Sequence, residues 1–361
     1  MKAAVQFEVP GKLEIVDIEI DRPRSHEVLI RTIASGLCHS DLHFLEGKYI
    51  HPVPVVLGHE AAGIVEEVGD AVTGIKAGDH VVTCLSIFCG SCEFCLSGRP
   101  VLCTREGVDR GADETPRLSL DSALVHAFAR LGAFAEKMLV HEHSVVTIRP
   151  DMPFDRAALL GCAVVTGIGA VTNTAGMRTG STVAVIGCGG IGLNAVQGAS
   201  IAGASRIVAI DKLAWKLELA RNFGATDLVD AAEEDPVAAV RTLIAGGVDY
   251  AFEAIGLKST AEQAFQMLRQ SGTATVIGMI PPGQKIEVEG QDLVFSEKKL
   301  RGSHMGSNRF RIDIPLYIDL YLAGRLNLDD LVSARISLNE VNEGYAALTR
   351  GEVARSVIMF E

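Results

Sequence analysis

The sequence predicts an α/β protein in which a β-rich, barrel-like domain is interrupted by a doubly wound parallel sheet. Three observations lead to this prediction. Short β-branched runs fill the chain to about residue 150, strand and helix patterns alternate from about residue 164, and the tail after residue 304 leaves that rhythm. At 361 residues the chain is long enough for two domains. We expect residues 1–163 and 305–361 to form one domain and residues 164–304 the other.

The barrel is predicted from the first part of the chain. Residues 28–34, 55–68 and 80–84 alternate apolar and polar side chains or are continuously β-branched, and turn residues separate them. Irregular excursions occupy residues 35–53 and 85–130. This spacing predicts a small antiparallel unit, which the tail completes with helices at 316–323 and 338–348 and a final strand at 356–360.

The second domain is predicted from alternating strands and helices. An apolar run at 181–186 ends in glycines, a helical pattern follows at 191–202, and a second strand at 206–210 precedes a helix at 212–223. Four further strands are expected at 227–229, 248–253, 273–278 and 299–302. Six strands with helices between them describe a doubly wound sheet.

Composition excludes several classes of function. The formal net charge is −12 and the sequence contains no basic run, so nucleic acid is not an expected partner. The sequence lacks an unbroken apolar stretch of the roughly 18 residues that a membrane helix needs. The N-terminus lacks the apolar core of a secretory signal, and eight cysteines are expected to serve as metal ligands in a reducing compartment. We expect a cytoplasmic protein.

A glycine-rich turn predicts a dinucleotide site. The sequence G-x-G-x-x-G directly follows a predicted strand and opens a helix, where free backbone N–H groups and the helix dipole favour a pyrophosphate. Asp211 ends the next strand, where a carboxylate accepts hydrogen bonds from ribose hydroxyls and repels the extra phosphate of NADP, so NAD is the predicted cofactor. Lys216, one helical turn later, is predicted to reach the adenosine ribose. The residues of the turn are Gly187, Gly189, Gly190, Ile191 and Gly192.

Four closely spaced thiols predict a structural metal site. Closed tetrahedral zinc sites are built from cysteines on one loop, and they stabilise the fold without taking part in chemistry. An iron–sulfur cluster is the main alternative, but its bacterial run has a shorter last gap and a proline after the fourth cysteine. A disulfide conflicts with the expected compartment. The four residues are Cys89, Cys92, Cys95 and Cys103, in a lobe of about residues 85–110.

A second, dispersed set of residues predicts a catalytic metal site. Cys38, His59 and Cys162 supply the two-cysteine, one-histidine set of a zinc ion whose fourth position stays open. Glu60, next to the histidine, is a candidate transient ligand or field-tuning carboxylate. Asp41 is expected to hold the outer ring N–H of His59, as the residues behind metal ligands commonly do.

Together these motifs resemble the zinc-dependent alcohol dehydrogenases of the medium-chain dehydrogenase/reductase superfamily. The family signature G-H-E-x2-G-x5-G-x2-V appears here as Gly58-His59-Glu60, Gly63, Gly69 and Val72. The four-cysteine lobe and the glycine turn also stand where that family has them, and the resemblance extends to the ending Arg355–Ile358. It implies a GroES-like catalytic domain interrupted by a Rossmann domain, and it implies one catalytic and one structural zinc ion in each chain.

The resemblance also implies a mechanism. Zinc lowers the pKa of the bound hydroxyl, and the resulting zinc-bound alkoxide transfers hydride to NAD. Ser40 and His43 match the family's proton relay, which runs through the cofactor ribose. His39 and Arg355 match contacts to the pyrophosphate, and Thr166 matches a contact to the nicotinamide.

The substrate is the least determined feature of the sequence. Leu85, Ile277, Met279 and His304 are the expected pocket residues, and they favour medium aliphatic or benzylic primary alcohols and their aldehydes. The alternative is a glutathione–formaldehyde adduct. The arginine used by that branch of the family is replaced here by Gly107, and only Arg105, Arg110 or Arg117 are left to substitute for it.

Two further expectations concern catalysis and assembly. A remote alternative is an NAD-binding zinc protein without catalysis, which would be expected to lack the open zinc site and the relay pair. The resemblance implies a homo-oligomer. The long region after Cys103 resembles the dimeric branch of the family more than the tetrameric branch.

Overall fold

The computed structural model describes residues 1–111 and 113–361, and the chain divides into two compact units. The first unit comprises Met1–Cys162, Arg309–Gly324 and Leu328–Glu361, and the second comprises Ala163–Asn308 and Arg325–Asn327. The chain thus returns to the first unit after Asn308, whereas the sequence analysis placed the return at residue 305. Residues up to Asn308 stay with the second unit because the backbone of Gly306 packs directly on Gly169: a Cβ on Gly169 would lie 2.4 Å from the Gly306 oxygen.

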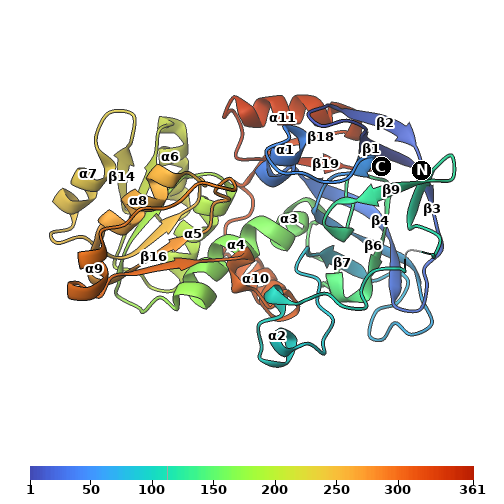
Figure 1. The fold of residues 1–361 in the computed structure, drawn as a ribbon, viewed down its shortest axis with the longest axis horizontal. Helices are drawn as coiled ribbons and strands as arrows, with labels where there is room; N and C mark the ends of the chain where they lie inside the picture. The colour runs from blue at the N-terminus through green and yellow to red at the C-terminus, as the bar shows by residue number, and fades with distance from the viewer. Residues whose placement is uncertain (112) are drawn as a thin grey trace. The chain divides into compact units, whose positions relative to one another are not determined.

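The first unit is built on two sheets, and Figure 1 labels many of their strands. One has the strand order β2-β1-β5-β9-β8-β3, and the other has the order β11-β7-β6-β4-β19-β18, with β10 also paired to β4. The strands are β1 (Lys2–Gln6), β2 (Leu13–Asp17), β3 (Glu19–Ile20), β4 (Glu27–Gly36), β5 (Val55–Val56), β6 (Glu60–Val68), β7 (His80–Thr83), β8 (Leu118–Leu120), β9 (Ala123–Ala127), β10 (Lys137–His141), β11 (Val145–Thr147), β18 (Val332–Ile336) and β19 (Arg355–Met359). The helices are α1 (His39–Leu45), α2 (Glu93–Leu96), α3 (Phe154–Leu159), α10 (Phe310–Leu322) and α11 (Val341–Thr349).

The structure differs from the predicted barrel in two respects. Pairing is antiparallel except between β5 and β9 and between β18 and β19, which are parallel. The run 55–68 was predicted as continuous, but it is two strands, β5 and β6, which belong to different sheets. Gly58, with φ of +87°, makes this change of direction possible, and a Cβ there would collide with the ring of Phe134. The break places His59 between the two strands.

The second unit is a six-stranded sheet with the order β14-β13-β12-β15-β16-β17, and every pair in it is parallel. The order reverses between β12 and β15, which is the switch point where doubly wound sheets bind ligands. The strands are β12 (Thr182–Ile186), β13 (Arg206–Asp211), β14 (Asp227–Asp230), β15 (Val248–Glu253), β16 (Leu268–Val276) and β17 (Lys299–Gly302). The helices are α4 (Val165–Gly169), α5 (Gly190–Ile201), α6 (Ala214–Asn222), α7 (Pro236–Leu243), α8 (Lys258–Gln266) and α9 (Gly290–Phe295).

A long apolar helical run links the two units along the chain. It joins α3 and α4 through a π-helical turn at Leu160–Val164 and continues as π-helix over Ala170–Ala175. The sequence predicted no membrane-length apolar stretch, but the helical run Phe154–Ala175 spans 22 residues and is long and apolar enough to cross a membrane. Since 89% of its most apolar window is buried inside the protein, the run has the burial expected of a core helix.

Candidate functional site

The dispersed metal ligands are brought together by three separate elements of the first unit. Cys38 is the N-cap of α1, two residues after the last residue of β4. His59 and Glu60 stand where β6 begins, and Cys162 lies in the π-helical turn after α3. Extra turns of this type are common at functional sites because the inserted residue redirects one side chain out of the helical repeat.

The four ligand atoms of Cys38, His59, Glu60 and Cys162 lie within 4.8 Å of one another, and all four residues are buried. Among the residues that the structure describes, Nε2 of His59 and both carboxylate oxygens of Glu60 are buried without a hydrogen-bond partner. Unpartnered buried polar atoms are rare, and two thiols with an imidazole are a donor set that zinc prefers. The residues therefore fit a zinc ion.

Asp41 orients the histidine as the sequence analysis expected. Its Oδ1 lies 3.0 Å from Nδ1 of His59 and accepts a hydrogen bond of 3.1 Å from the backbone N–H of Gly58. Both side chains are almost completely inaccessible to solvent. With Nδ1 held in this way, the Nε2 atom is the one that points at the ligand group.

The ionisable groups of the site shift one another's pKa values. A hydrogen bond from Cys162 and the nearby Arg355 charge lower the pKa of Cys38 well below its usual range, while burial raises the pKa of Glu60 to about 8. Arg355 donates to the Leu37 carbonyl at 2.9 Å, and its Nη2 lies 3.5 Å from Oε1 of Glu60. The structure thus places Arg355 beside Glu60, and its contact with a pyrophosphate stays a prediction.

The four thiols of the lobe also lie together. The sulfur of Cys92 is 3.5 Å from that of Cys95 and 3.7 Å from that of Cys103, and Cys89 is 4.0 Å from Cys95. A tetrahedron with Zn–S bonds of about 2.3 Å has edges of about 3.8 Å. These separations leave room for one ion rather than an iron–sulfur cluster, and they exclude a disulfide, which needs about 2.05 Å. None of the eight cysteines is disulfide-bonded.

The predicted proton-relay residues share one helix. Ser40 and His43 lie three residues apart on α1, and the Cys38 thiol lies 3.6 Å from the Ser40 hydroxyl. His43 is half-buried, with its ring 6.0 Å from that of Tyr49. Burial, followed by the charge of Lys48, lowers the pKa of His43. His39, at the start of the same helix, is exposed.

The glycine turn has the backbone geometry expected of a dinucleotide site. Gly187 has φ of +94°, and a Cβ on Gly192 would lie 1.6 Å from the Gly187 carbonyl oxygen. A Cβ on Gly189 would meet nothing, so space is open in front of α5, as a pyrophosphate needs. Gly190 and Ile191 begin the helix.

The other predicted cofactor residues of the second unit have local partners. Asp211 ends β13 and accepts hydrogen bonds from the backbone N–H groups of Cys188 at 2.7 Å and Lys212 at 2.8 Å. Nζ of Lys216 lies 5.6 Å from the centre of the Trp215 ring. Thr166 is buried, with its hydroxyl 3.5 Å from the Met305 sulfur. Asp211 thus stands beside the turn, where it was expected.

The predicted pocket residues are divided between the units. Leu85 is half-buried against a core cluster of the first unit. In the second unit Ile277 is buried, while Met279 and His304 are exposed. Neither unit holds all four, so their joint pocket stays a prediction.

Sequence reasoning missed an aromatic group beside the metal ligands. The Phe128 ring lies 5.7 Å from the His59 ring and 4.6 Å from the Phe44 ring, and Tyr49 lies 5.7 Å from Phe44. Phe128 also lines a cavity of about 640 Å³ in the first unit. The close spacing of the aromatic residues 44 and 49 in the sequence could have indicated part of this group. Phe128 could not have been found in this way because it is far from them in the sequence.

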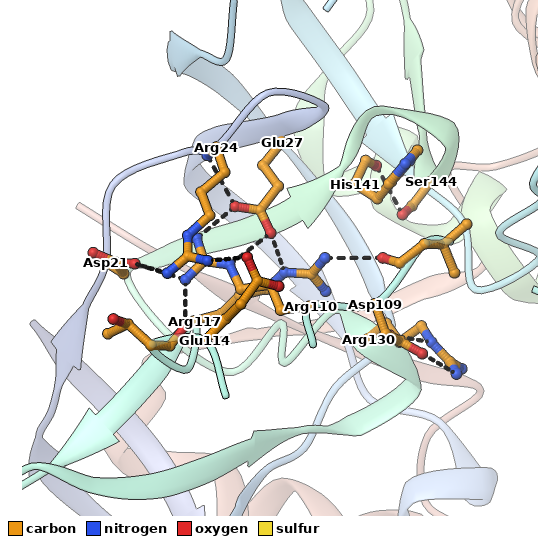
Figure 2. Close-up of polar contacts among 12 residues, drawn as sticks. Asp21, Arg24, Glu27, Asp109, Arg110, Glu114, Arg117, Arg130, His141 and Ser144 are labelled. Atoms are coloured by element: carbon orange, nitrogen blue, oxygen red, sulfur yellow. Dashed lines mark hydrogen bonds and ion pairs between the residues drawn. The ribbon is translucent and has the colours of Figure 1, made fainter. Parts of the chain in front are cut away.

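A buried ion-pair network holds the loop that forms one wall of this cavity (Figure 2). The Glu27 carboxylate, at the start of β4, accepts hydrogen bonds from Arg110 at 2.5 and 3.0 Å and from Arg117 at 2.7 Å. Arg110 also donates to Asp21 and to two backbone carbonyls. Both guanidinium groups are therefore committed to holding the loop on the barrel.

Comparison with known proteins agrees with this geometry. Residues 24–151 match the alcohol dehydrogenase GroES-like domain, and residues 190–321 match the zinc-binding dehydrogenase domain. The chain is 38% identical over 364 residues to the NDMA-dependent alcohol dehydrogenase of Amycolatopsis methanolica, covering 99% of this chain and 98% of that protein. It is 37% identical over 366 residues to alcohol dehydrogenase class-3 of Pisum sativum, covering 99% and 97%.

Solved structures show the same relationship. The crystal structure of benzyl alcohol dehydrogenase from Acinetobacter calcoaceticus matches with a TM-score of 0.94 at 32% identity, covering 100% of this chain and 99% of that chain. The matched domains, the relatives and the two ligand clusters exclude the alternative of an NAD-binding zinc protein without catalytic activity. The chain belongs to the zinc-dependent alcohol dehydrogenases of the medium-chain dehydrogenase/reductase superfamily, and it is an oxidoreductase.

Proposed function

We propose that this enzyme transfers hydride between NAD and primary alcohols that carry a medium aliphatic or benzylic group. The observation that carries the proposal is the buried set of Cys38, His59 and Cys162 with an unpartnered Nε2 on the histidine. Zinc bound there would polarise a substrate hydroxyl and lower its pKa. The three ligands and Asp41 are all buried, so bulk water is kept away from them.

The proton is assigned to the residues of α1. Ser40 would accept the proton from the substrate hydroxyl, and His43 would take it up for release to solvent, with the ribose of a bound cofactor supplying the hydroxyls between them. Because its pKa is lowered by burial and by Lys48, the His43 imidazole is neutral near pH 7 and able to accept a proton.

The aromatic group next to His59 supports an apolar substrate. Phe128 lies directly beside the His59 ring, and Phe44 and Tyr49 extend the aromatic surface from it, so an apolar substrate group could pack there. The benzyl alcohol dehydrogenase among the solved relatives is consistent with this preference. Each methylene buried on such a surface favours binding by about 0.8 kcal/mol.

A glutathione–formaldehyde adduct receives less support. Of the three arginines available to bind its carboxylate, Arg110 and Arg117 donate to Glu27 and to backbone carbonyls. Of the three, only Arg105 is left to bind the carboxylate of the adduct. The similarity to alcohol dehydrogenase class-3 of Pisum sativum does not change the contacts that Arg110 and Arg117 make in this chain. The adduct therefore enters the test as a competing substrate.

The proposal is tested by measuring NADH formation with ethanol, hexanol, benzyl alcohol, a secondary alcohol, and formaldehyde with and without glutathione. We expect kcat/KM for hexanol and benzyl alcohol to exceed that for ethanol by at least about tenfold. Turnover restricted to the glutathione adduct would overturn the substrate assignment. If no substrate reacts, denaturing the protein and identifying the released nucleotide shows whether NAD is trapped in the site.

Replacing Asp211 with asparagine is expected to weaken the preference for NAD over NADP. The amide keeps an oxygen for the N–H groups of Cys188 or Lys212, but it loses the charge that binds ribose hydroxyls and repels a phosphate. The ratio of kcat/KM for the two cofactors should fall by about 10- to 100-fold, since a hydrogen bond to a charged group is worth about 1.5–3 kcal/mol. The control is Asp227→Asn at the other end of the adjacent strand β14, which should leave the ratio unchanged. An unchanged ratio in Asp211→Asn would contradict the assignment.

We also propose that the chain forms a homodimer in a reducing, cytoplasmic environment. Strand β17 is an edge of its sheet, with an unpaired side, and α9 exposes Val294 and Phe295 by 70% and 78%. Open edges and exposed apolar groups of this kind are typically covered by another chain. Light scattering of the purified protein, compared with Phe295→Glu, tests the assembly. A monomer in both samples would contradict it.

A further inference from the structure

A buried tyrosine outside the ligand set packs among residues that stand next to the metal ligands in the sequence. Tyr345 is on α11, and its ring belongs to the core cluster that contains Leu37, Leu57 and Phe134. The ring is 6.2 Å from that of Phe134 and only 4% of the residue is exposed. Its hydroxyl is buried and has no hydrogen-bond partner. A core position needs only the ring, so the hydroxyl requires a separate explanation, because burying it unpaired costs about 1–3 kcal/mol.

A buried acceptor that could receive a hydrogen bond from this hydroxyl belongs to Asp41. Oδ1 of this carboxylate is used by His59 and Gly58, while Oδ2 is buried without a partner. Asp41 is the neighbouring charge that, after burial, contributes most to raising the pKa of Tyr345 well above its usual range. The phenol therefore keeps its proton, and it can donate to an oxygen that can only accept.

We propose that Tyr345 is a positioning residue of the catalytic metal centre, whose hydroxyl donates to Oδ2 of Asp41 and completes a chain from Tyr345 through Asp41 to His59. This inference rests on the proposed zinc site. The hydrogen bond fixes the plane of the carboxylate and so the direction in which Nε2 of His59 points. It also withdraws charge from Asp41, which makes the imidazole a weaker donor and leaves the metal a stronger Lewis acid.

The test is Tyr345→Phe, which keeps the ring against Phe134 and removes only the hydroxyl. Zinc is released from the holoenzyme to a chromogenic chelator, and the Co²⁺-substituted enzyme is examined by visible absorption. We expect release from the catalytic site to accelerate by about tenfold, because removing a group behind a metal ligand typically weakens metal binding by 10- to 100-fold. The cobalt bands should shift, and release from the four-cysteine site should not change.

Two further variants separate this role from general packing. Tyr321→Phe removes a hydroxyl that donates to Asp329 at 3.0 Å on the surface of the same unit, and it should change neither readout. In an Asp41→Asn background, Tyr345→Phe should accelerate release by less than about twofold, because the two residues act through one hydrogen bond. Thermal unfolding of each variant confirms that the fold is retained.

The results that would overturn the inference are distinct from those that would overturn the proposed function. If the wild-type protein binds two zinc ions and oxidises alcohols, but Tyr345→Phe leaves the zinc release rate and the cobalt spectrum unaltered, only the proposed role of Tyr345 is contradicted. The role of Tyr345 is also contradicted if Tyr345→Phe accelerates zinc release by the same factor in the Asp41→Asn background as in the wild type. If the wild-type protein binds no zinc at Cys38, His59 and Cys162, both the role of Tyr345 and the proposed function are contradicted.

Discussion

Replacing Cys38 with serine should lower kcat/KM for alcohol oxidation by at least about 1,000-fold and reduce the zinc content from two ions per chain to one. The thiol is one of three ligands that would hold the ion in the open site, and a hydroxyl is a far poorer zinc ligand than a thiolate. Loss of the ion removes several kcal/mol of stabilisation of the developing oxyanion, and 1.36 kcal/mol corresponds to a factor of ten in rate.

The matched control is Cys84→Ser, which makes the same change in an equally buried thiol of the same unit. Burial raises the pKa of Cys84 to about 11, so this residue is a neutral thiol that lies outside the ligand set. Zinc content by atomic emission and activity should be close to wild type in this variant. If Cys38→Ser retains both zinc ions and full activity, the assignment of the catalytic site is wrong. Circular dichroism of both variants separates ligand loss from misfolding.

Replacing Glu27 with glutamine should lower the free energy of unfolding by about 3–5 kcal/mol. The carboxylate is 4% exposed and compensates the buried charges of Arg110 and Arg117, which have to remain in place without it. Breaking one partner of a buried ion pair typically costs this amount. The control is Glu114→Gln, since Glu114 pairs with Arg24 at the surface, where solvent screens the ion pair, and its loss should destabilise the protein much less. Urea unfolding followed by fluorescence or circular dichroism gives both values. A loss for Glu27→Gln no larger than that for Glu114→Gln would contradict the network's role.

The same network predicts a specific pH dependence. Burial alone would raise the pKa of Glu27, but hydrogen bonds from Arg110 and Arg117 lower it to about 2 from its ordinary value of 4.5. A carboxyl group with a depressed pKa in the folded state binds fewer protons there than in the unfolded state. Its stabilisation is therefore complete above about pH 4.5 and is lost as the pH falls toward 2.

The difference in unfolding free energy between wild type and Glu27→Gln should consequently shrink by about 3 kcal/mol between pH 6 and pH 2. Unfolding in urea at a series of pH values measures it, and Glu114→Gln again serves as the reference for surface carboxylates. A difference that stays constant over this range would show that Glu27 is not held ionised by the two arginines.

Much of this enzyme could be predicted from its sequence because the relevant signals are local. The four cysteines of the lobe lie within fifteen residues, from Cys89 to Cys103, and a closed metal site follows from that spacing. The glycine turn lies between one strand and one helix, and Asp211 ends the next strand. Each of these follows from turn chemistry and hydrophobic periodicity, which depend on residues only a few positions apart.

Other features required the tertiary structure because strand register and chain return decide them. Glu27 and Arg110 are separated by 83 positions, and Arg355 contacts the carbonyl of Leu37 across 318. Nothing near Tyr345 or Phe128 in the sequence indicates that they lie beside Asp41 and His59. The residue types at the metal centre could be recognised in the sequence, and they were enough to predict a zinc-dependent oxidoreductase. Arg355 and Phe128 come from distant segments, and only the packed fold brings them beside Glu60 and His59.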